Sequence, residues 1–155
     1  VYDGGAKTKV DIGYVGKSKQ INIQIVKDLI AQGYVPVIAP IGVGEDGESY
    51  NINADYVAAD IAGALKAEKL LLLTDTEGVY KNFADKKSFI STLKADEART
   101  FIKDGIISGG MIPKVEACLR ALDKGANKAY IIDGRLAHSI ILELFTDSGI
   151  GTEVE

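Results

Sequence analysis

Apolar residues along the chain follow two spacings, one typical of helices and one typical of strands. Recurrence every three to four residues predicts helices over residues 20–32, 53–65, 95–104, 113–124 and 138–145. Short apolar or β-branched runs predict strands over residues 11–15, 34–39, 70–73, 89–91, 129–132 and a segment after Gly151. Because strands alternate with helices almost throughout, the sequence predicts an α/β fold, a three-layer αβα sandwich with a mainly parallel central sheet. Sites in such folds lie at the carboxyl ends of strands.

Turn-forming and polar residues separate these elements. Residues 1–9 are expected to form a loop or a hairpin end, and residues 41–50, with glycines among acidic residues, are expected to form a loop. The polar residues 81–88 are predicted to be exposed. Thr92 is a candidate cap for the helix that begins at Ala95. No linker or repeat divides the 155 residues, so we expect one domain.

The helix over residues 53–65 carries the clearest candidate site. Asn53 is a natural N-cap, and Asp55 falls in the first turn, where the helix dipole favours an ionised carboxylate. The continuous apolar run of the next strand predicts burial on both faces. Thr74 and Asp75 follow that strand. The predicted apolar face of the helix comprises Ala54, Val57, Ala58, Ile61, Ala62 and Leu65.

Each of these polar residues has a structural as well as a functional explanation. Asp55 is a candidate metal ligand, base or organiser of lysine side chains, or only a helix-capping carboxylate. Asn51 and Asn53 either bind a substrate carboxylate or amide, or form the turn before the helix. Thr74 and Asp75 either contact a nucleotide or form a polar turn. The local pattern leaves these alternatives open.

Lys114 lies in the first turn of its predicted helix, next to the positive end of the helix dipole. A bound anion would relieve this unfavourable position. Pro113 suits the first helical position, and the preceding Gly109 and Gly110 allow close backbone approach, so that helix amides can join the lysine in binding phosphate. The alternative is a solvated surface lysine.

Composition narrows the classes of function. The net charge of −4 disfavours nucleic acid as a partner, because no basic stripe is available to neutralise phosphates. No apolar run approaches the length of a membrane span, so no membrane partner is expected. The single cysteine, Cys118, favours a reducing, cytoplasmic compartment, and its apolar surroundings predict a core residue rather than a nucleophile. His138, the only histidine, is expected to cap or pack a helix rather than to catalyse.

Five stretches resemble motifs of the N-acetyl-L-glutamate kinase family, within the amino acid kinase superfamily, and occur in that family's order. They are residues 35–47, Asn-Ile-Asn-Ala-Asp at 51–55, residues 72–78, Gly-Gly-Met-Ile-Pro-Lys at 109–114, and residues 131–135. The resemblance covers nearly everything from Asp11 onward and corresponds to the C-terminal half of these kinases. It implies the amino acid kinase fold, with residues 1–155 as a single nucleotide-binding domain.

This resemblance implies ATP-dependent phosphorylation of the γ-carboxylate of N-acetyl-L-glutamate in arginine biosynthesis, with Mg²⁺ accompanying ATP. Asp55 then corresponds to the aspartate that orients the catalytic lysines, and Lys114 to the lysine that neutralises charge on the ATP side of the transferred phosphoryl group. Asn51 matches the asparagine that binds acetylglutamate, and Asn53 lies beside it. The nucleotide-binding walls correspond to Thr74, Asp75, Gly78, Val79, Tyr80, Ser108, Gly109, Gly110 and Lys114.

The chain also departs from the family pattern. The N-terminal half, with a second catalytic lysine and a glycine-rich substrate loop, has no counterpart, so this chain is expected to be inactive alone, and its start at Val1 suggests a fragment. Glu143 and Gly149 match positions associated with inhibition by L-arginine, but Tyr130 stands where arginine-sensitive members tend to carry histidine. A homo-oligomer is expected, although the helix that builds the hexamer of those members is missing. Two alternatives are a related kinase acting on carrier-bound aminoadipate and a non-catalytic module that binds a regulator.

Overall fold

The computed structural model describes residues 2–3, 6–7, 13–146 and 149–155, and a four-stranded sheet lies at their centre. The strand order is β5 (Lys69–Thr74), β9 (Lys128–Asp133), β10 (Thr152–Val154) and β8 (Thr92–Leu93). β5 and β9 are parallel, as are β10 and β8, whereas β9 and β10 are antiparallel. The sheet is therefore mixed and mostly parallel, which confirms the predicted fold class.

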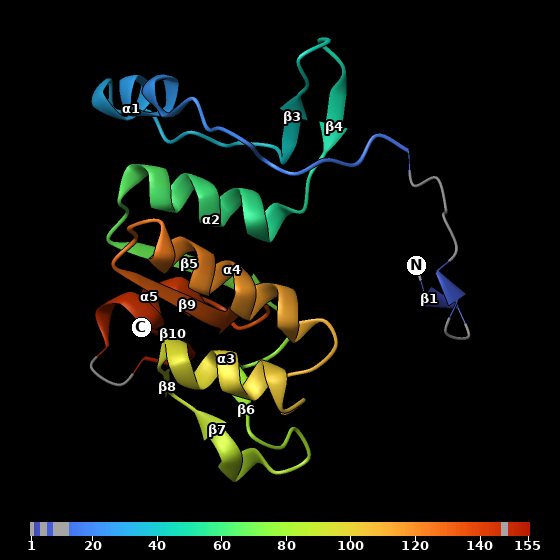
Figure 1. The fold of residues 1–155 in the computed structure, drawn as a ribbon. Helices are drawn as coiled ribbons and strands as arrows, with labels where there is room; N and C mark the ends of the chain where they lie inside the picture. The colour runs from blue at the N-terminus through green and yellow to red at the C-terminus, as the bar shows by residue number, and fades with distance from the viewer. Residues whose placement is uncertain (1, 4–5, 8–12, 147–148) are drawn as a thin grey trace.

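Helices cover both faces of this sheet (Figure 1). Along β9 the buried side chains alternate, so that Ala129 and Ile131 join the main core while Tyr130 and Ile132 are buried outside it. α5 (Ser139–Phe145) packs against β9 on this second face. The helices that share the main core are α2 (Ala54–Leu65), α3 (Ala95–Lys103) and α4 (Met111–Asp123).

α2 and α4 lie side by side and run in the same direction, so that their N-terminal ends lie at the same edge of the molecule (Figure 1). Gly63 permits this close approach, because a Cβ atom there would lie 2.3 Å from the Cβ atom of Lys124. The positive ends of both helix dipoles therefore point to one place. The side-chain pairs that align the two helices are Asp55 with Lys114, Tyr56 with Glu116, and Asp60 with Arg120.

α2 begins as predicted, since the side chain of Asn53 accepts a hydrogen bond from the amide of Tyr56 at 3.2 Å. The predicted apolar face is wrong in detail. Val57 and Ile61 are only half-buried and line a hollow beside α1 (Ile23–Ala31). The small residues of α2 let it approach α4 closely, so the side of α2 that faces α4 is the buried one. The buried residues of α2 are Ala59, Asp60, Ala62 and Gly63.

Two predictions in the first third of the chain are wrong. Residues 34–39 form no strand, because no strand of the described residues pairs with them, and Val35 and Val37 are 87% and 96% exposed. Residues 41–50 form an antiparallel hairpin rather than a loop, from β3 (Ile41–Val43) to β4 (Ser49–Asn51). Gly47 adopts a φ of 82° in its turn.

Three other predictions also differ from the structure. β5 is not covered on both faces, since Leu73 is 47% exposed. Thr92 lies in β8, and Lys94 is the residue at the N-cap of α3. Residues 11 and 12 of the predicted first strand lie outside the described residues, and Val15 at its other end forms only an isolated bridge with Asn51.

Several short elements complete the chain. β1 (Tyr2–Asp3) and β2 (Ala6–Lys7) pair as the predicted hairpin end. β6 (Val79–Tyr80) pairs with β7 (Phe89–Ile90), and a 3₁₀ turn, η1 (Lys86–Ser88), lies between them in the exposed polar segment. Among the residues that the structure describes, no helix has the length and hydrophobicity needed to cross a membrane.

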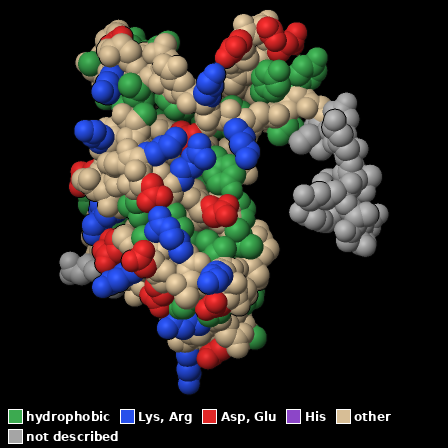
Figure 2. All heavy atoms as spheres, viewed as in Figure 1, with side chains coloured by type: hydrophobic (Ala, Val, Ile, Leu, Met, Phe, Trp, Pro, Cys, Tyr) green, Lys and Arg blue, Asp and Glu red, His purple; other side chains and the backbone are tan. Residues whose placement is uncertain are grey.

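A large apolar surface remains uncovered on α1 and the extended segment that follows it. Figure 2 shows a hollow between α1 and the β3–β4 hairpin, and these two elements with α2 line a cavity of about 850 Å³. We call this surface the apolar face. Its exposed side chains are Ile25, Leu29, Ile30, Tyr34, Val35, Val37, Ile38, Ile41 and Val43.

Candidate functional site

An open groove of about 520 Å³ lies between three parts of the chain. They are the end of β5, the turn into β6 and the start of α4. Of the nine residues predicted for the nucleotide-binding walls, only Gly109 is not part of its lining. Segments that are far apart in sequence and that the family resemblance assigned to one site therefore meet in one place. The remaining lining residues are Thr76, Phe83, Ile106, Ile107 and Met111.

The first wall of the groove depends on a glycine. Gly78 has a φ of 154°, and a Cβ atom there would lie 2.5 Å from the hydroxyl of Thr152. That hydroxyl accepts a hydrogen bond from the amide of Val79 at 2.8 Å and donates one to the carbonyl of Ile90 at 2.6 Å. These hydrogen bonds fix the wall to Thr152, the first residue of β10. A larger residue at position 78 would displace the wall.

The second wall is the turn that begins α4. Gly109 has a φ of 57°, a conformation that favours glycine, and Gly110 is the residue at the N-cap. No side chain caps this helix start. α4 begins at Met111, so Pro113 is its third residue rather than its first, which corrects the predicted position. Lys114 nevertheless lies in the first turn, as predicted.

Lys114 and Asp55 form an ion pair at the converging ends of α4 and α2. The Nζ atom of Lys114 lies 3.1 Å and 3.4 Å from the two carboxylate oxygens of Asp55. Both side chains are mostly buried, with 22% and 23% of their surface exposed. A cation held in this way beside two helix N-termini can bind an anionic group in the groove that it lines.

The two asparagines lie outside this groove. Asn53 uses its side-chain oxygen to cap α2, and it lines a separate cavity of about 720 Å³. Asn51 is an exposed residue of β4, whose backbone bonds to Tyr14 and Gly16. Asn53 therefore forms the start of the helix, which is the structural explanation given for it above.

Glu143 and Gly149 lie close together. Glu143 belongs to α5, and Gly149 precedes β10. The buried carboxylate of Glu143 accepts hydrogen bonds from the amides of Ile150 and Gly151 at 2.7 Å and 2.9 Å. Gly149 has a φ of 59°, and a Cβ atom there would lie 2.8 Å from an oxygen of Glu143. The pair holds the turn before the last strand, and it is not part of the groove lining.

The remaining candidates have structural positions. Cys118 is fully buried, and burial raises the pKa of its thiol to about 12, so it is a core residue as predicted rather than a nucleophile. His138 is the residue at the N-cap of α5 but makes no side-chain cap hydrogen bond.

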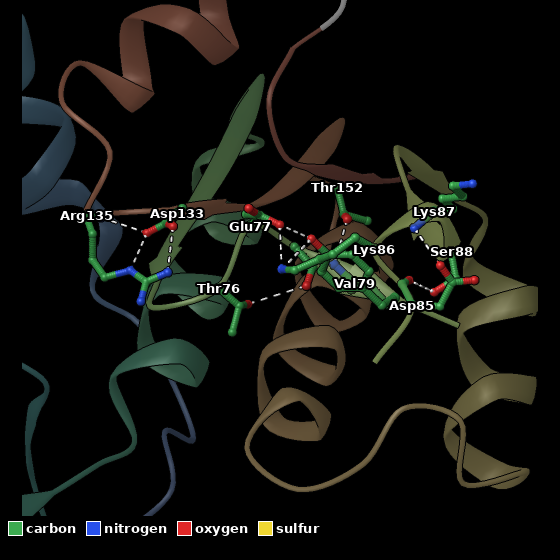
Figure 3. A network of polar contacts seen from close by, with 12 residues as sticks. Thr76, Glu77, Val79, Asp85, Lys86, Lys87, Ser88, Asp133, Arg135 and Thr152 are labelled. Atoms are coloured by element: carbon green, nitrogen blue, oxygen red, sulfur yellow. Dashed lines mark hydrogen bonds and ion pairs between the residues drawn. The ribbon is translucent and has the colours of Figure 1, made fainter. Parts of the chain in front are cut away.

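A polar cluster that links the groove-lining residue Tyr80 to Glu77 and Lys86 was not predicted (Figure 3). The hydroxyl of Tyr80 donates to Glu77, and the ammonium of Lys86 lies 2.9 Å from the same carboxylate. These two hydrogen bonds lower the pKa of Glu77, and burial followed by the Glu77 contact raises the pKa of Tyr80. The three residues are not spaced as one helix face, so the sequence held no signal for the cluster.

Asp133 and Arg135 form a second contact seen in Figure 3, at the end of β9. Two guanidinium nitrogens of Arg135 lie 2.9 Å and 2.8 Å from the carboxylate oxygens, and they hold the pKa of Asp133 at about 2. The register of the sheet places Asp133 beside Thr74. This charged pair therefore adjoins Thr74, one of the residues that line the groove.

Asp60 is a buried charge that sequence reasoning also missed. Its carboxylate accepts a bidentate contact from Arg120 at 2.6 Å and 2.8 Å and a contact from Lys124 at 2.5 Å, and Ser18 donates to it as well. One signal was present: an aspartate stands on a helix face of small residues, and two cations four residues apart follow on another helix. This network joins α2 to α4.

The described residues contain no cluster of three or more His, Cys, Asp or Glu side chains that could hold a metal ion. Mg²⁺ is commonly held by one or two carboxylates together with phosphate oxygens and water. Asp75, an exposed carboxylate in the groove lining, fits that mode.

Comparison with known proteins decides the family. A model described as the amino acid kinase family matches residues 3–133. The chain belongs to the amino acid kinase family. It is 55% identical over 152 residues to an acetylglutamate kinase of Heliobacterium modesticaldum, covering 98% of this chain and 52% of that protein. It is 56% identical to one of Pelotomaculum thermopropionicum, covering 97% of this chain and 51% of that protein.

A solved structure gives the same fold. N-acetylglutamate synthase from Neisseria gonorrhoeae, complexed with coenzyme A and L-arginine, matches this member of the amino acid kinase family with a TM-score of 0.84 and 25% identity. The match covers 99% of this chain and 34% of that chain. The chain spans about half the length of the curated relatives it matches.

Proposed function

We propose that this chain is the ATP-binding half of an acetylglutamate kinase, which transfers the γ-phosphoryl group of ATP to the γ-carboxylate of N-acetyl-L-glutamate. The observation that carries the proposal is the groove, in which the Lys114–Asp55 pair lies beside the glycine turn of α4. The identity of 55% to acetylglutamate kinases supports the choice of reaction.

The groove suits the charge of a triphosphate. Phosphoryl transfer needs alignment and neutralisation of charge rather than covalent chemistry from the protein. Lys114 supplies the positive charge, and the ends of α2 and α4 add their dipoles. Asp55 holds the ammonium group in position. Mg²⁺, brought by ATP, would supply further neutralisation of the phosphates, with Asp75 as the available carboxylate.

Titration of the chain with Mg–ATP in a calorimeter tests the proposal. We expect saturable binding at one site and a thermal unfolding midpoint that rises with ligand concentration, because ATP binds the folded state. A chain that shows neither heat of binding nor a thermal shift at millimolar Mg–ATP contradicts the proposal and favours a non-catalytic module that binds a regulator. Turnover is measured on the full-length protein, with the isolated chain expected to release no ADP in the presence of N-acetyl-L-glutamate.

The acceptor is the second part of the proposal. Asn51 and Asn53 are proposed to contact N-acetyl-L-glutamate at the start of α2, next to the groove that holds ATP. Comparing rates of the full-length protein on N-acetyl-L-glutamate and on carrier-bound aminoadipate separates the two acceptors. Glu143 and Gly149 are proposed to contribute to L-arginine inhibition of the full-length protein, as the arginine complex of the synthase from Neisseria gonorrhoeae suggests. Unchanged activity across an arginine titration contradicts that role.

We further propose that the chain forms a homo-oligomer through the apolar face. The apolar face exposes nine large apolar side chains, and large exposed apolar patches are associated with protein–protein contact. Light scattering coupled to gel filtration is expected to give a mass that rises with concentration above that of one chain. Replacing Val35 and Val37 with Lys should return the mass to one chain, whereas Phe145→Lys, at a side chain 80% exposed on α5, should not. Equal masses for all three proteins contradict the proposal.

A further inference from the structure

Thr152 is a fully buried residue that holds one wall of the groove without lining the groove itself. Its hydroxyl accepts a hydrogen bond from the amide of Val79 at 2.8 Å and donates one to the carbonyl of Ile90 at 2.6 Å (Figure 3). The described residues that line the groove include Gly78, Val79 and Tyr80, but not Thr152. The hydroxyl can therefore affect a ligand only through the position of this wall.

The two partners of the hydroxyl lie opposite each other in the β6–β7 hairpin. The register pairs Val79 with Ile90, so the hydroxyl bridges an amide of one strand and a carbonyl of the other. Both hydrogen bonds are buried, and a buried amide or carbonyl without a partner is costly. Without the hydroxyl, these two groups either stay unpaired or take other partners. Either outcome releases the wall from β10.

The backbone around Thr152 is fixed on both sides. The carboxylate of Glu143 accepts hydrogen bonds from the amides of the two residues that directly precede Thr152, at 2.7 Å and 2.9 Å. The amide of Glu153, which follows it, donates to the carbonyl of Ser91 at 2.8 Å. Because both sides are held, the hydroxyl cannot follow a wall that moves away. Thr152 is therefore a fixed anchor for the wall.

We propose that Thr152 is a positioning residue for nucleotide binding, because its hydroxyl keeps residues 78–80 where ATP requires them. The inference rests on the proposed function and adds a residue outside the groove that determines the affinity for the nucleotide. A chain without the hydroxyl holds the wall in this position only part of the time, and its apparent affinity falls by that fraction. Since two hydrogen bonds are lost together, we expect a fall of about tenfold.

Calorimetry of Mg–ATP binding to three variants of the chain tests the inference. Thr152→Val removes the hydroxyl but keeps the shape of the side chain, and it should weaken binding about tenfold. Thr152→Ser keeps the hydroxyl and should bind ATP as the wild type does. Val154→Ala is the matched control, since Val154 is fully buried in the same strand and belongs to the main core. This control should lower the melting temperature and leave the affinity unchanged.

Kinetics of the full-length protein separate positioning from a general loss of structure. Thr152→Val should raise the KM for ATP about tenfold and leave the KM for N-acetyl-L-glutamate unchanged. A loss of folded protein alone lowers the apparent kcat and leaves both KM values unchanged. The inference is overturned if the KM for ATP stays at the wild-type value, or if Val154→Ala loses as much affinity as Thr152→Val.

Hydrogen exchange of the wild-type chain gives a test that needs no variant to fold. The amide of Val79 exchanges only when its hydrogen bond to Thr152 opens. If ATP requires the anchored wall, saturating Mg–ATP should slow this exchange about tenfold or more. An exchange rate at Val79 that does not respond to Mg–ATP overturns the inference while ATP binding stands. If the wild-type chain gives no heat of binding with Mg–ATP, the proposed function fails and this inference fails with it.

Discussion

Replacing Lys114 with Ala is expected to weaken Mg–ATP binding to this chain by roughly 10- to 100-fold, the loss of one charge-assisted hydrogen bond of about 1.5–3 kcal/mol. Among the described residues that line the groove, Lys114 is the only lysine or arginine, and it stands in the first turn of α4, where an anion is also favoured by the helix dipole. Isothermal calorimetry measures the effect. Lys114→Arg keeps the charge and should recover part of the affinity.

Two further variants separate charge in the groove from general charge. Lys103 is an exposed lysine in the last turn of α3, and Lys103→Ala should bind ATP as the wild type does. Asp55→Asn removes the partner of Lys114 instead of the cation. Because the ammonium is then free for phosphate and a nearby negative charge is lost, ATP affinity should rise by roughly two- to fivefold. In the full-length protein the same variant should lower the rate of turnover, because Lys114 is no longer held in place.

The signs of these changes decide the role of the pair. Equal losses for Lys114→Ala and Lys103→Ala show that Lys114 makes no special contact with the nucleotide. A loss for Asp55→Asn as large as that for Lys114→Ala shows that the pair is structural and that the groove collapses without it.

Local signals in the sequence were enough for the elements that form the groove. Asn53 caps α2 through a bond to an amide three residues away, so the residue type alone predicts the helix start. The run from Lys69 to Thr74 forms a strand whose polar residues follow at its end. The meeting of Lys114 with Asp55 is different, because 59 residues separate them. It was predicted from resemblance to a family, since no local pattern specifies which two helix ends converge.

The failures have a common physical cause, which is that pairing and burial are set by distant parts of the chain. Residues 34–39 have strong strand propensity, but a strand needs a neighbour, and Val37 remains 96% exposed without one. The small residues of α2 pack on α4, whereas the larger apolar Val57 and Ile61 face α1. Small side chains allow the two helix axes to come close, and this mattered more for burial than the hydrophobicity of each side chain. Asp60 in the core is positioned by Arg120 and Lys124, which lie 60 and 64 residues away in sequence, and so it was not predicted.

Replacing Asp60 with Ala is expected to have the largest effect on stability, a loss of about 3 kcal/mol in the free energy of unfolding and a fall of about 10 °C in the melting temperature. The carboxylate is 2% exposed and is the common partner of Arg120 and Lys124. Both cations are partly exposed and can turn to water, which keeps the loss below that of a fully buried pair. Thermal unfolding followed by circular dichroism measures it.

Asp123→Ala is the matched control. Asp123 also receives two contacts from an arginine, since Nη2 of Arg99 lies 3.0 Å from each carboxylate oxygen. Its side chain is 63% exposed, so the expected loss is about 1 kcal/mol or less. Similar losses for the two variants contradict the importance of burial at Asp60.

Acid titration tests the same network by its sign. Burial by itself raises the pKa of Asp60, but the hydrogen bonds from Arg120, Lys124 and Ser18 outweigh it and lower the pKa from 3.8 to about 2. A depressed pKa in the folded state means that stabilisation is fully present above pH 3.8 and is lost as the pH falls toward 2. The difference in unfolding free energy between the wild type and Asp60→Asn should therefore shrink over that interval by about 2 kcal/mol. Asp133 and Glu77 titrate in both proteins and cancel in this difference, so a difference that stays constant between pH 4 and 2 contradicts an ionised Asp60 as the link between α2 and α4.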